Sequence, residues 1–554
     1  MQMRPILIAG LAALALAGCG KKESAGKAPA AGANPAAADV SAASPLAQAY
    51  RLGGAEALDV DALFALFPES KPTYESAKFD SKLGATVVSK LRFAKGADGE
   101  ALLVDRAELY GVDLDAIKRV KEGEPAIDAP FEKVFDKVRL FGVHPETSGD
   151  GSKMTIGAAE FDQLQIRRGG APDGPKKGNG ARAVNAVSLG GLYFKDLAVA
   201  NENEASGALS LTAFDLRFVG LGGGKLAAVI AKDLGYEMAP TDASRFAMSK
   251  AFGPAGGLIF SGPLKGFIAP DNQRVSVKSF EWRGLDFSGL LAYGLKEEKP
   301  PLTAKNLVNL GTMKAADVDA YVGGKKARHT SEATISATEF TWLIPSKIRA
   351  ATKGEQYDFS AYLPETEEAA IAALKKHGLN DVKASSDFAW DWNAGAGGAS
   401  LKSAFDSTGL ADVNFSLDLA GFELEKINAA LEANDKDAVM NAGAFKGFAL
   451  KIADEKLLDA LFEISAAQMG SSAGELRQSA PALLRLSGAQ AAAMSPKIAG
   501  YIDAVANFIA QGGTLEIAAA PAAPVPFAEI AAAAQAGPQA VPDLLALTVT
   551  HKKK

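Results

Sequence analysis

The sequence predicts an α+β fold dominated by strands, in which long, curved antiparallel β-meanders are joined by a few amphipathic helices. Three observations predict this fold. Apolar and polar side chains alternate over many segments, the connecting segments are rich in glycine, and helical periodicity is mostly confined to the last third of the chain. Alternation with a period of two gives a strand one buried and one wet face, which is typical of antiparallel sheets.

The clearest alternation lies between residues 387 and 419. In "DFAWDWN" the side chains of Phe388, Trp390 and Trp392 share one face of the predicted strand. The glycine-rich "NAGAGG" that follows suits a hairpin turn. Further alternating strands are predicted at residues 87–93, 153–166, 208–218, 413–419 and 544–550.

The predicted helices have recognisable ends. One begins after Ser495 with Pro496 in its first position and ends at Gly512. Another is expected at 454–468 with Asp454 as its N-cap, and a shorter one at 364–378. Two segments read as three strands followed by a helix, which suggests a repeated unit: residues 191–234 and 387–431.

The start of the chain has the features of an export signal. A short basic stretch with Arg4 and an apolar run at 5–18 precede the only cysteine, Cys19. The run is shorter than the roughly 20 apolar residues of a transmembrane helix and is typical of a secretory signal. Leu16-Ala17-Gly18-Cys19 resembles the lipobox of bacterial lipoproteins. The resemblance implies a signal peptide at 1–18 and acylation of Cys19, which becomes the new N-terminus.

The resemblance also implies a location. Gly20, rather than Asp, follows the cysteine, as in lipoproteins sent to the outer membrane of Gram-negative bacteria. Retention in the inner membrane is one alternative, and ordinary secretory cleavage with Cys19 as a free thiol is another. With Cys19 acylated, the mature chain has no thiol, so disulfides, cysteine metal sites and cysteine nucleophiles are excluded.

Composition divides the rest of the chain. Residues 19–45 are almost entirely Ala, Gly, Pro, Ser and a few charges, which predicts a flexible tether spanning roughly 25 to 30 Å. The length of the remainder predicts two or three domains, and we expect β-rich domains at 46–175 and 183–378 and a β-meander with helices at 379–554. A turn-rich stretch at 169–180 marks the first boundary.

The charge balance argues against a nucleic-acid partner, and the hydropathy argues against a further membrane span. The chain has 59 Lys and Arg against 65 Asp and Glu, a net charge of −6. This balance argues against nucleic acid, whose binding depends on neutralising phosphates. After the signal peptide, no segment has the 18 or so consecutive apolar residues that predict a membrane span. The expected membrane contact is therefore the lipid on Cys19.

Several motifs resemble chemical sites but fit structural roles better. "GSSAG" at 470–474 matches the G-x-S-x-G pattern with Ser472 as nucleophile, but a helix is expected before it, and Glu475 completes a capping box. "VGLGGGKL" at 219–226 lacks the first Gly and the final Ser or Thr of a phosphate loop, and we expect a flexible turn between a strand and a helix.

Two candidate metal sites also fit other roles. Asp391, Asn393 and Gly395 begin like a calcium loop, but Lys402 stands where the bidentate Glu belongs, so a hairpin turn is expected. No two histidines have the spacing of a helical metal pair. We therefore predict no cofactor, no metal and no catalytic residue; the histidines are His144, His329, His377 and His551.

These observations predict a non-enzymatic outer-membrane lipoprotein that faces the periplasm as a binding or scaffold module, with an envelope protein or a lipid as partner. A lipid-handling protein that holds acyl chains on the face of Phe388, Trp390 and Trp392 is the first alternative, and a plain hydrophobic core closed by the late helices would remove that surface. A serine hydrolase using Ser472 is the second alternative. Residues 380–550, with "AAAPAAPVPFAEIAAAAQAGP" near their end, are also similar to poorly characterised β-rich envelope proteins of proteobacteria, which implies no catalytic site.

Overall fold

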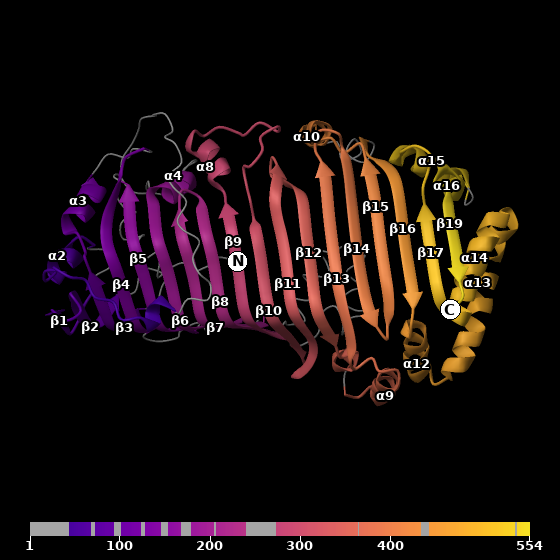
Figure 1. Cartoon of the computed structure of the whole chain (residues 1–554), viewed down its shortest axis with the longest axis horizontal. Coiled ribbons are helices and arrows are strands. Elements are labelled where there is room, and N and C mark those ends of the chain that lie inside the picture. Colours follow the sequence, from indigo (N-terminus) through magenta and orange to yellow (C-terminus); the bar gives the residue numbers. More distant parts are fainter. Residues whose placement is uncertain are drawn as a thin grey trace. The chain divides into compact units, whose positions relative to one another are not determined.

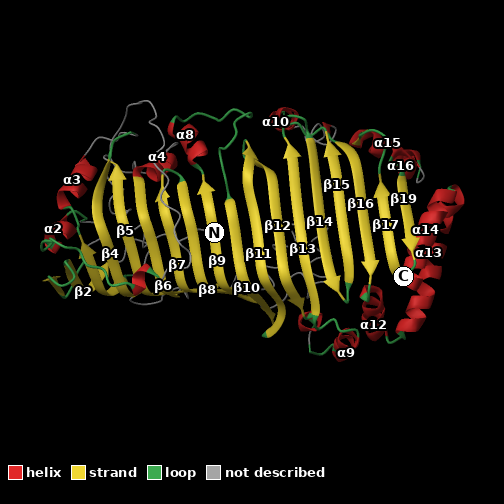
Figure 2. Ribbon diagram, viewed as in Figure 1, coloured by secondary structure: helices red, strands yellow, loops and turns green. Residues whose placement is uncertain are grey.

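Strands dominate the structure, as the sequence predicted (Figures 1 and 2). The computed structural model describes residues 44–67, 72–93, 101–122, 128–145, 153–167, 179–203, 207–239, 273–363, 365–433, 442–537 and 540–554. Neighbouring strands in these residues pair antiparallel, and several helices lie in the C-terminal part. The strand-dominated α+β class is therefore confirmed. Cys19, the signal peptide and all but the end of the expected tether lie outside the described residues.

The chain divides into two compact units. The first unit is Met1–Ala247 with Arg274–Ala315, and the second is Met248–Gln273 with Ala316–Lys554. Strand β10 (Gly311–Val322) begins in the first unit and ends in the second. The division of the chain into domains at 46–175, 183–378 and 379–554 stays a prediction.

The first unit is a meander of long strands with short helices between them. Strands β1 to β8 pair antiparallel in the order of the sequence. Its elements are η1 (Pro45–Ala47), α2 (Val60–Ala65), β1 (Ser76–Asp80), β2 (Ala85–Phe93), β3 (Leu102–Tyr110), α3 (Leu114–Glu122), β4 (Phe131–Pro145), β5 (Lys153–Arg167), α4 (Asn179–Ala186), β6 (Val187–Asn203), β7 (Gly207–Gly222), β8 (Lys225–Ala239), β9 (Gln273–Asp286) and α8 (Ser288–Leu295).

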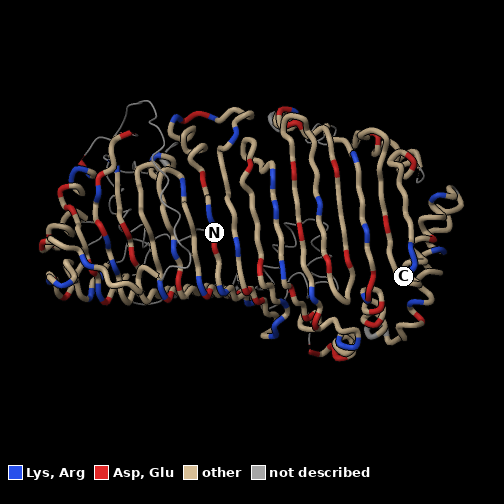
Figure 3. Tube along the Cα trace, in the orientation of Figure 1, with Lys and Arg blue, Asp and Glu red and all other residues tan. Residues whose placement is uncertain are grey.

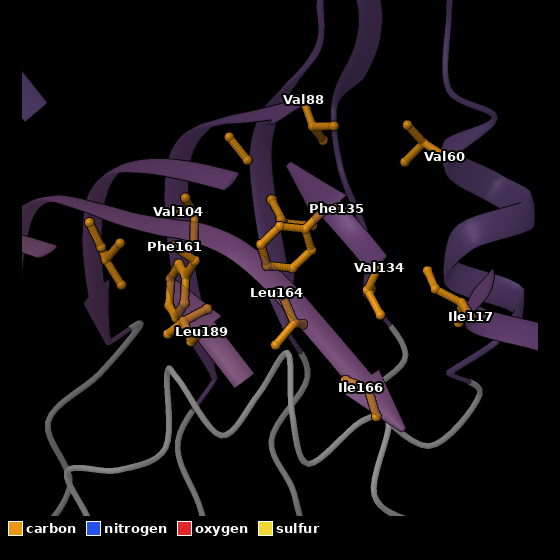
Figure 4. Close-up of a cluster of buried hydrophobic side chains, with 14 of the residues drawn as sticks. Val60, Val88, Val104, Ile117, Val134, Phe135, Phe161, Leu164, Ile166 and Leu189 are labelled. Atoms are coloured by element: carbon orange, nitrogen blue, oxygen red, sulfur yellow. The ribbon is translucent and has the colours of Figure 1, made fainter. Parts of the chain in front are cut away.

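The hydrophobic core of the first unit lies where α2 and α3 pack on the first strands. Val60 of α2 and Ile117 of α3 lie near strand residues such as Val88 and Val134 (Figure 4). All four side chains are at most 3 % exposed. Burial of aliphatic side chains contributes about 1.5 to 3 kcal/mol each, so this cluster stabilises the unit.

Beside this core, β3 to β7 carry a buried charged row. Glu108, Arg139, Glu160, Tyr193 and Arg217 are directly opposite one another in register, so their side chains share one face of the sheet. Each is less than 9 % exposed. The segment after the tether lies against this row, because the Arg139 guanidinium donates to two backbone carbonyl oxygens of residues 45–48, at 3.2 and 3.0 Å.

The second unit is also an antiparallel meander, with helices between its strands. Strands β11 to β17 pair in sequence order, and β19 pairs with β17. Its elements after β10 are β11 (Lys325–Thr341), β12 (Ile344–Tyr357), η2 (Phe359–Tyr362), α9 (Glu368–Lys376), β13 (Val382–Asn393), β14 (Gly398–Thr408), β15 (Ala411–Ala420), α10 (Leu424–Glu432), β16 (Ala444–Asp454), α12 (Leu457–Met469), α13 (Ala473–Met494), α14 (Pro496–Gln511), β17 (Gly513–Ala519), β18 (Val525–Pro526), α15 (Phe527–Ala536), α16 (Ala540–Leu544) and β19 (Leu547–Lys552).

The predicted signals mark both ends of α14 but not the start of α12, where the prediction of Asp454 as N-cap was wrong. Helix α14 begins after Ser495 with Pro496 in its first position and ends at Gly512. Asp454 is the last residue of β16 rather than the N-cap of α12, but its carboxylate accepts the backbone N–H of Leu458 at 3.0 Å. No helix in the described residues is long and apolar enough to cross a membrane.

One secondary-structure prediction was wrong and another began too early. The helix expected after the glycine-rich turn at 219–226 is the strand β8, which pairs with β7 along its length. Residues 228–231 are all buried, so both faces of the strand are covered and no alternation marks it. The strand expected at 544–550 begins only at Leu547, because α16 extends to Leu544. Residues 191–234 therefore end in a strand, whereas residues 387–431 end in helix α10. The two segments are not repeats of one unit.

Candidate binding surface

The serine of the G-x-S-x-G pattern caps a helix. The Ser472 hydroxyl accepts the backbone N–H of Glu475 at 3.1 Å, and the Glu475 carboxylate accepts the backbone N–H of Ser472 at 3.4 Å. This is the predicted capping box, and it opens α13. Helix α12 precedes it and ends at Gly470 with φ 64°, so the strand that a nucleophile elbow requires is missing.

The glycine-rich segment at 219–226 is a hairpin turn. Gly223 and Gly224 have φ values of 57° and 79° and connect β7 to β8. Positive φ at both central residues is the requirement of the two-residue hairpin turn that matches strand twist. Lys225 forms an ion pair with Asp286 at 3.3 Å. A phosphate loop would lead into a helix, and here it leads into a strand.

The segment that resembled a calcium loop is also a turn. The Asn393 side-chain oxygen accepts the backbone N–H groups of Gly395 at 3.1 Å and Ala396 at 3.0 Å. Asp391 pairs with Arg349 at 2.6 Å. The side-chain oxygen atoms that a calcium loop would use therefore accept hydrogen bonds within the turn or form an ion pair. This agrees with the predicted hairpin turn.

The four histidines lie apart from one another. His144 contacts the Pro145 carbonyl oxygen, His377 follows the last residue of α9, and His551 contacts the Gly512 carbonyl oxygen at 2.7 Å. Within the described ranges, no three His, Cys, Asp or Glu side chains are grouped so that they could hold a metal ion.

The fourth histidine belongs to a polar network that the sequence analysis missed. The Asp319 carboxylate lies 2.7 Å from Nδ1 of His329, and the Ser331 hydroxyl lies 3.3 Å from Nε2 of the same ring. Burial favours a higher pKa for Asp319, but hydrogen bonds from Lys326 and His329 outweigh it and lower the pKa of this carboxyl. Asp319 is therefore an anion at neutral pH and orients the ring.

This network has the order of acid, base and hydroxyl found in serine hydrolases. The Ser331 hydroxyl also lies 3.3 Å from the Gly354 carbonyl oxygen, to which it can donate its single proton. The flanking residues Thr330 and Glu332 are paired with β12. The Ser331 hydroxyl is therefore shared between the His329 ring and the Gly354 carbonyl oxygen, between paired strands. We interpret the network as a polar contact of the strand surface.

One apolar face of the second unit continues from strand to strand. Residues directly opposite each other in an antiparallel pair have side chains on the same face. Starting from Trp390, the opposite residues are Ile348 on β12 and Leu401 on β14. This apolar face, as we call it, consists of two rows: Ile348, Trp390, Leu401, Leu417 and Phe448; and Ala350, Phe388, Ser403, Phe415 and Leu450.

Helices cover one side of the apolar face. Leu458 of α12 and Phe508 of α14 pack on Leu515 of β17, and all three are less than 9 % exposed. Phe388, Trp390 and Phe415 are only half-buried. In Figure 2, helices lie at the ends of the strands and beside β19, and none lies across β12 to β15 in this view. The late helices therefore close the part of the core at β16 to β19.

The apolar face carries satisfied polar groups and ends at a charged pair. The Trp390 indole donates to the Pro345 carbonyl oxygen at 3.1 Å. Further along the sheet, the Arg328 guanidinium on β11 donates to Glu355 on β12, and the Tyr357 hydroxyl donates to the same carboxylate at 3.0 Å. Burial raises the pKa of Tyr357, so its hydroxyl stays protonated. The Arg328 side chain is 37 % exposed, whereas that of Glu355 is 1 % exposed.

The opposite face of the same strands is polar. Lys402 on β14 lies opposite Ala389 and Ser416, and Lys451 on β16 lies opposite Glu516. Figure 3 shows basic and acidic residues along these strands. An open pocket of about 360 Å³ at the ends of β11 to β16 is lined mainly by charged and polar residues, among them Glu339, Lys347, Asp391, Asp418 and Lys446.

Comparison with known proteins adds a family match without a function. A family model described as "Uncharacterized protein" matches residues 404–552, which covers β15 to β19 and the helices between them. No curated protein matches the chain. The chain is therefore similar, over its C-terminal part, to a family for which no activity is given.

Proposed function

We propose that this chain is a non-enzymatic, periplasm-facing lipoprotein of the outer membrane, anchored through Cys19, and that it acts as a binding or scaffold module. The apolar face of the second unit is the observation that carries the proposal. A continuous apolar surface of half-buried side chains that remain in part accessible is a candidate interaction site. By contrast, the sequence motifs that resembled chemical sites form turns and a helix cap.

A lipid-handling role for the same face is the second candidate. It is favoured by the chemistry of the face, since aromatic and aliphatic side chains dominate both rows and the indole N–H of Trp390 already has an acceptor. Apart from Ser403, the side chains of the two rows are apolar or, at Trp390, already hydrogen-bonded, and such a surface suits a hydrocarbon occupant.

The experiment that separates a binding module from a hydrolase uses Ser472. We expect Ser472→Ala to lower the free energy of unfolding by roughly 0.5 to 2 kcal/mol and Ser472→Gly by only a few tenths, because Gly is tolerated at an N-cap. Chemical denaturation of the three proteins measures this difference. A nucleophile would instead leave stability nearly unchanged in both variants.

The same proteins are then treated with a fluorophosphonate probe and with p-nitrophenyl esters. We expect no covalent labelling and no turnover in the wild type. The matched variant Ser331→Ala tests the Asp319–His329–Ser331 network in the same assay. Labelling that disappears in Ser472→Ala or in Ser331→Ala would identify that serine as a nucleophile and refute the non-enzymatic function.

A further inference from the structure

We propose that residues 45–50 form a releasable strap, which holds the end of the expected tether on the first unit and detaches under load before that unit unfolds. Release lengthens the connection to the membrane and uncovers part of the buried charged row. The proposal rests on the proposed anchoring through Cys19, because only an anchored chain carries a load along its tether.

The first contact of the strap is a fork of hydrogen bonds from the sheet. The Arg139 guanidinium donates through Nη2 to the backbone carbonyl oxygens of Pro45 and Gln48, at 3.2 and 3.0 Å. These two residues lie at the start and just after the end of the single turn η1, none of whose residues is buried. The strap is therefore held here by its backbone and by one side chain of β4.

The second contact is the ring of Tyr50. It stands edge-on to the ring of Tyr110, with 4.9 Å between the two centroids. The ammonium of Lys137 lies 4.7 Å from the centroid of Tyr50, within the range of a cation–π contact. A segment with so few buried apolar contacts belongs to the parts of a fold that open at low free energy.

The surface beneath the strap keeps its own partners when the strap leaves. Arg139 Nε donates to Glu160 at 2.7 Å, and the Tyr110 hydroxyl donates to Glu108 at 2.7 Å. Release therefore leaves no buried charge unpaired, the event that makes breaking a buried ion pair costly. In the docked state, by contrast, the buried Ser44 hydroxyl has no hydrogen-bond partner among the described residues, which penalises docking.

The chain after the strap has a second fixed point. The Leu52 backbone N–H donates to the Leu83 carbonyl oxygen at 3.0 Å. The Leu52 carbonyl oxygen passes so close to Gly84 that a Cβ there would lie 1.8 Å from it. Release between the tether and this point frees the six residues of the strap, which extend to at most about 20 Å. The predicted tether span of roughly 25 to 30 Å would grow by up to that length.

The first test is limited proteolysis of the full chain with trypsin. Arg51 directly follows the strap, and Lys27 lies in the expected tether. Proteases cut a docked segment only when it opens, so we expect cleavage after Arg51 to be at least tenfold slower than after Lys27. Tyr50→Ala should speed cleavage after Arg51 several-fold, whereas Gln48→Ala, at an exposed side chain, should not change it. Equal rates at Arg51 and Lys27 in the wild type overturn the proposal.

The second test measures release by pulling on the chain. Cys19 is the only cysteine, so mature protein prepared without lipid takes a single optical-trap handle there, with the second handle on a C-terminal tag. We expect a reversible extension of about 20 Å at a force below that of unfolding, and we expect Tyr50→Ala to remove it. A wild-type trace without this step overturns the proposal, as does a step that persists unchanged in Tyr50→Ala.

Both tests use purified protein, so their outcomes are separate from that of the proposed function. If Cys19 did not carry the anchor, the slow cleavage and the extension step would remain, but the strap would bear no load in the cell and the proposal would be overturned. If the step were absent while Cys19 anchors the protein, the strap would be refuted and the lipoprotein function would stand.

Discussion

Replacing Glu160 with alanine is expected to lower the free energy of unfolding of the first unit by about 3 kcal/mol, because it leaves buried cations without their shared anion. Glu160 is 0 % exposed and accepts from both Lys137 and Arg139, the latter at 2.7 Å. Lys137 keeps a second partner, Asp162, at 3.1 Å, which places the expected cost at the lower end for a broken buried pair. Urea unfolding followed by circular dichroism measures the change.

An exposed ion pair provides the control for this prediction. Lys90 and Asp105 lie 2.6 Å apart, but their side chains are 64 % and 50 % exposed. Solvent screens such a pair, so Asp105→Ala should change stability little. If Glu160→Ala and Asp105→Ala lowered the free energy of unfolding equally, burial would not determine how much the Glu160 ion pairs stabilise the protein.

The second prediction concerns the anchor. We expect Cys19→Ala to abolish membrane attachment and to leave unprocessed precursor or soluble protein, because the proposed anchor is the lipid on this cysteine, in a segment that resembles a lipobox. Several acyl chains attach a protein stably, since each buried methylene contributes about 0.8 kcal/mol. Flotation of cell membranes after a high-salt wash measures attachment. Ser24→Ala, in the expected tether, is the control and should stay attached; a Cys19→Ala protein that still floats would contradict the lipoprotein interpretation.

The sequence predicted those features that depend on local pattern. Alternation located β13 and β15, because one face of each strand is apolar and the other polar. The capping box at Ser472 was predictable because all its atoms come from four consecutive residues. Strand β8 was not, because burial of Ala228 to Ala231 on both faces removes the alternation that distinguishes a strand from a helix.

Contacts that depend on the register between strands could not be predicted from the sequence. Glu160 meets Arg139 only because β4 and β5 pair in one particular register. Asp319 and His329 are ten residues apart, and their contact requires the turn between β10 and β11. The pair Gly323 and Gly324, both with positive φ, was the available signal for that turn. Reading it as a hairpin would have brought the two strands side by side, with Asp319 opposite Arg328, the residue before His329.

The central claim is that the apolar face of the second unit is where this protein holds its partner. A photo-crosslinking amino acid in place of Leu401 or Lys402, in the full chain with Cys19 intact, tests it most directly in the living envelope. The two positions are adjacent on β14 and face opposite sides of the sheet. Irradiation should produce a specific adduct, lipid or protein, from position 401 and none from position 402. Adducts of equal yield at both positions, or an adduct only at position 402, would contradict the account.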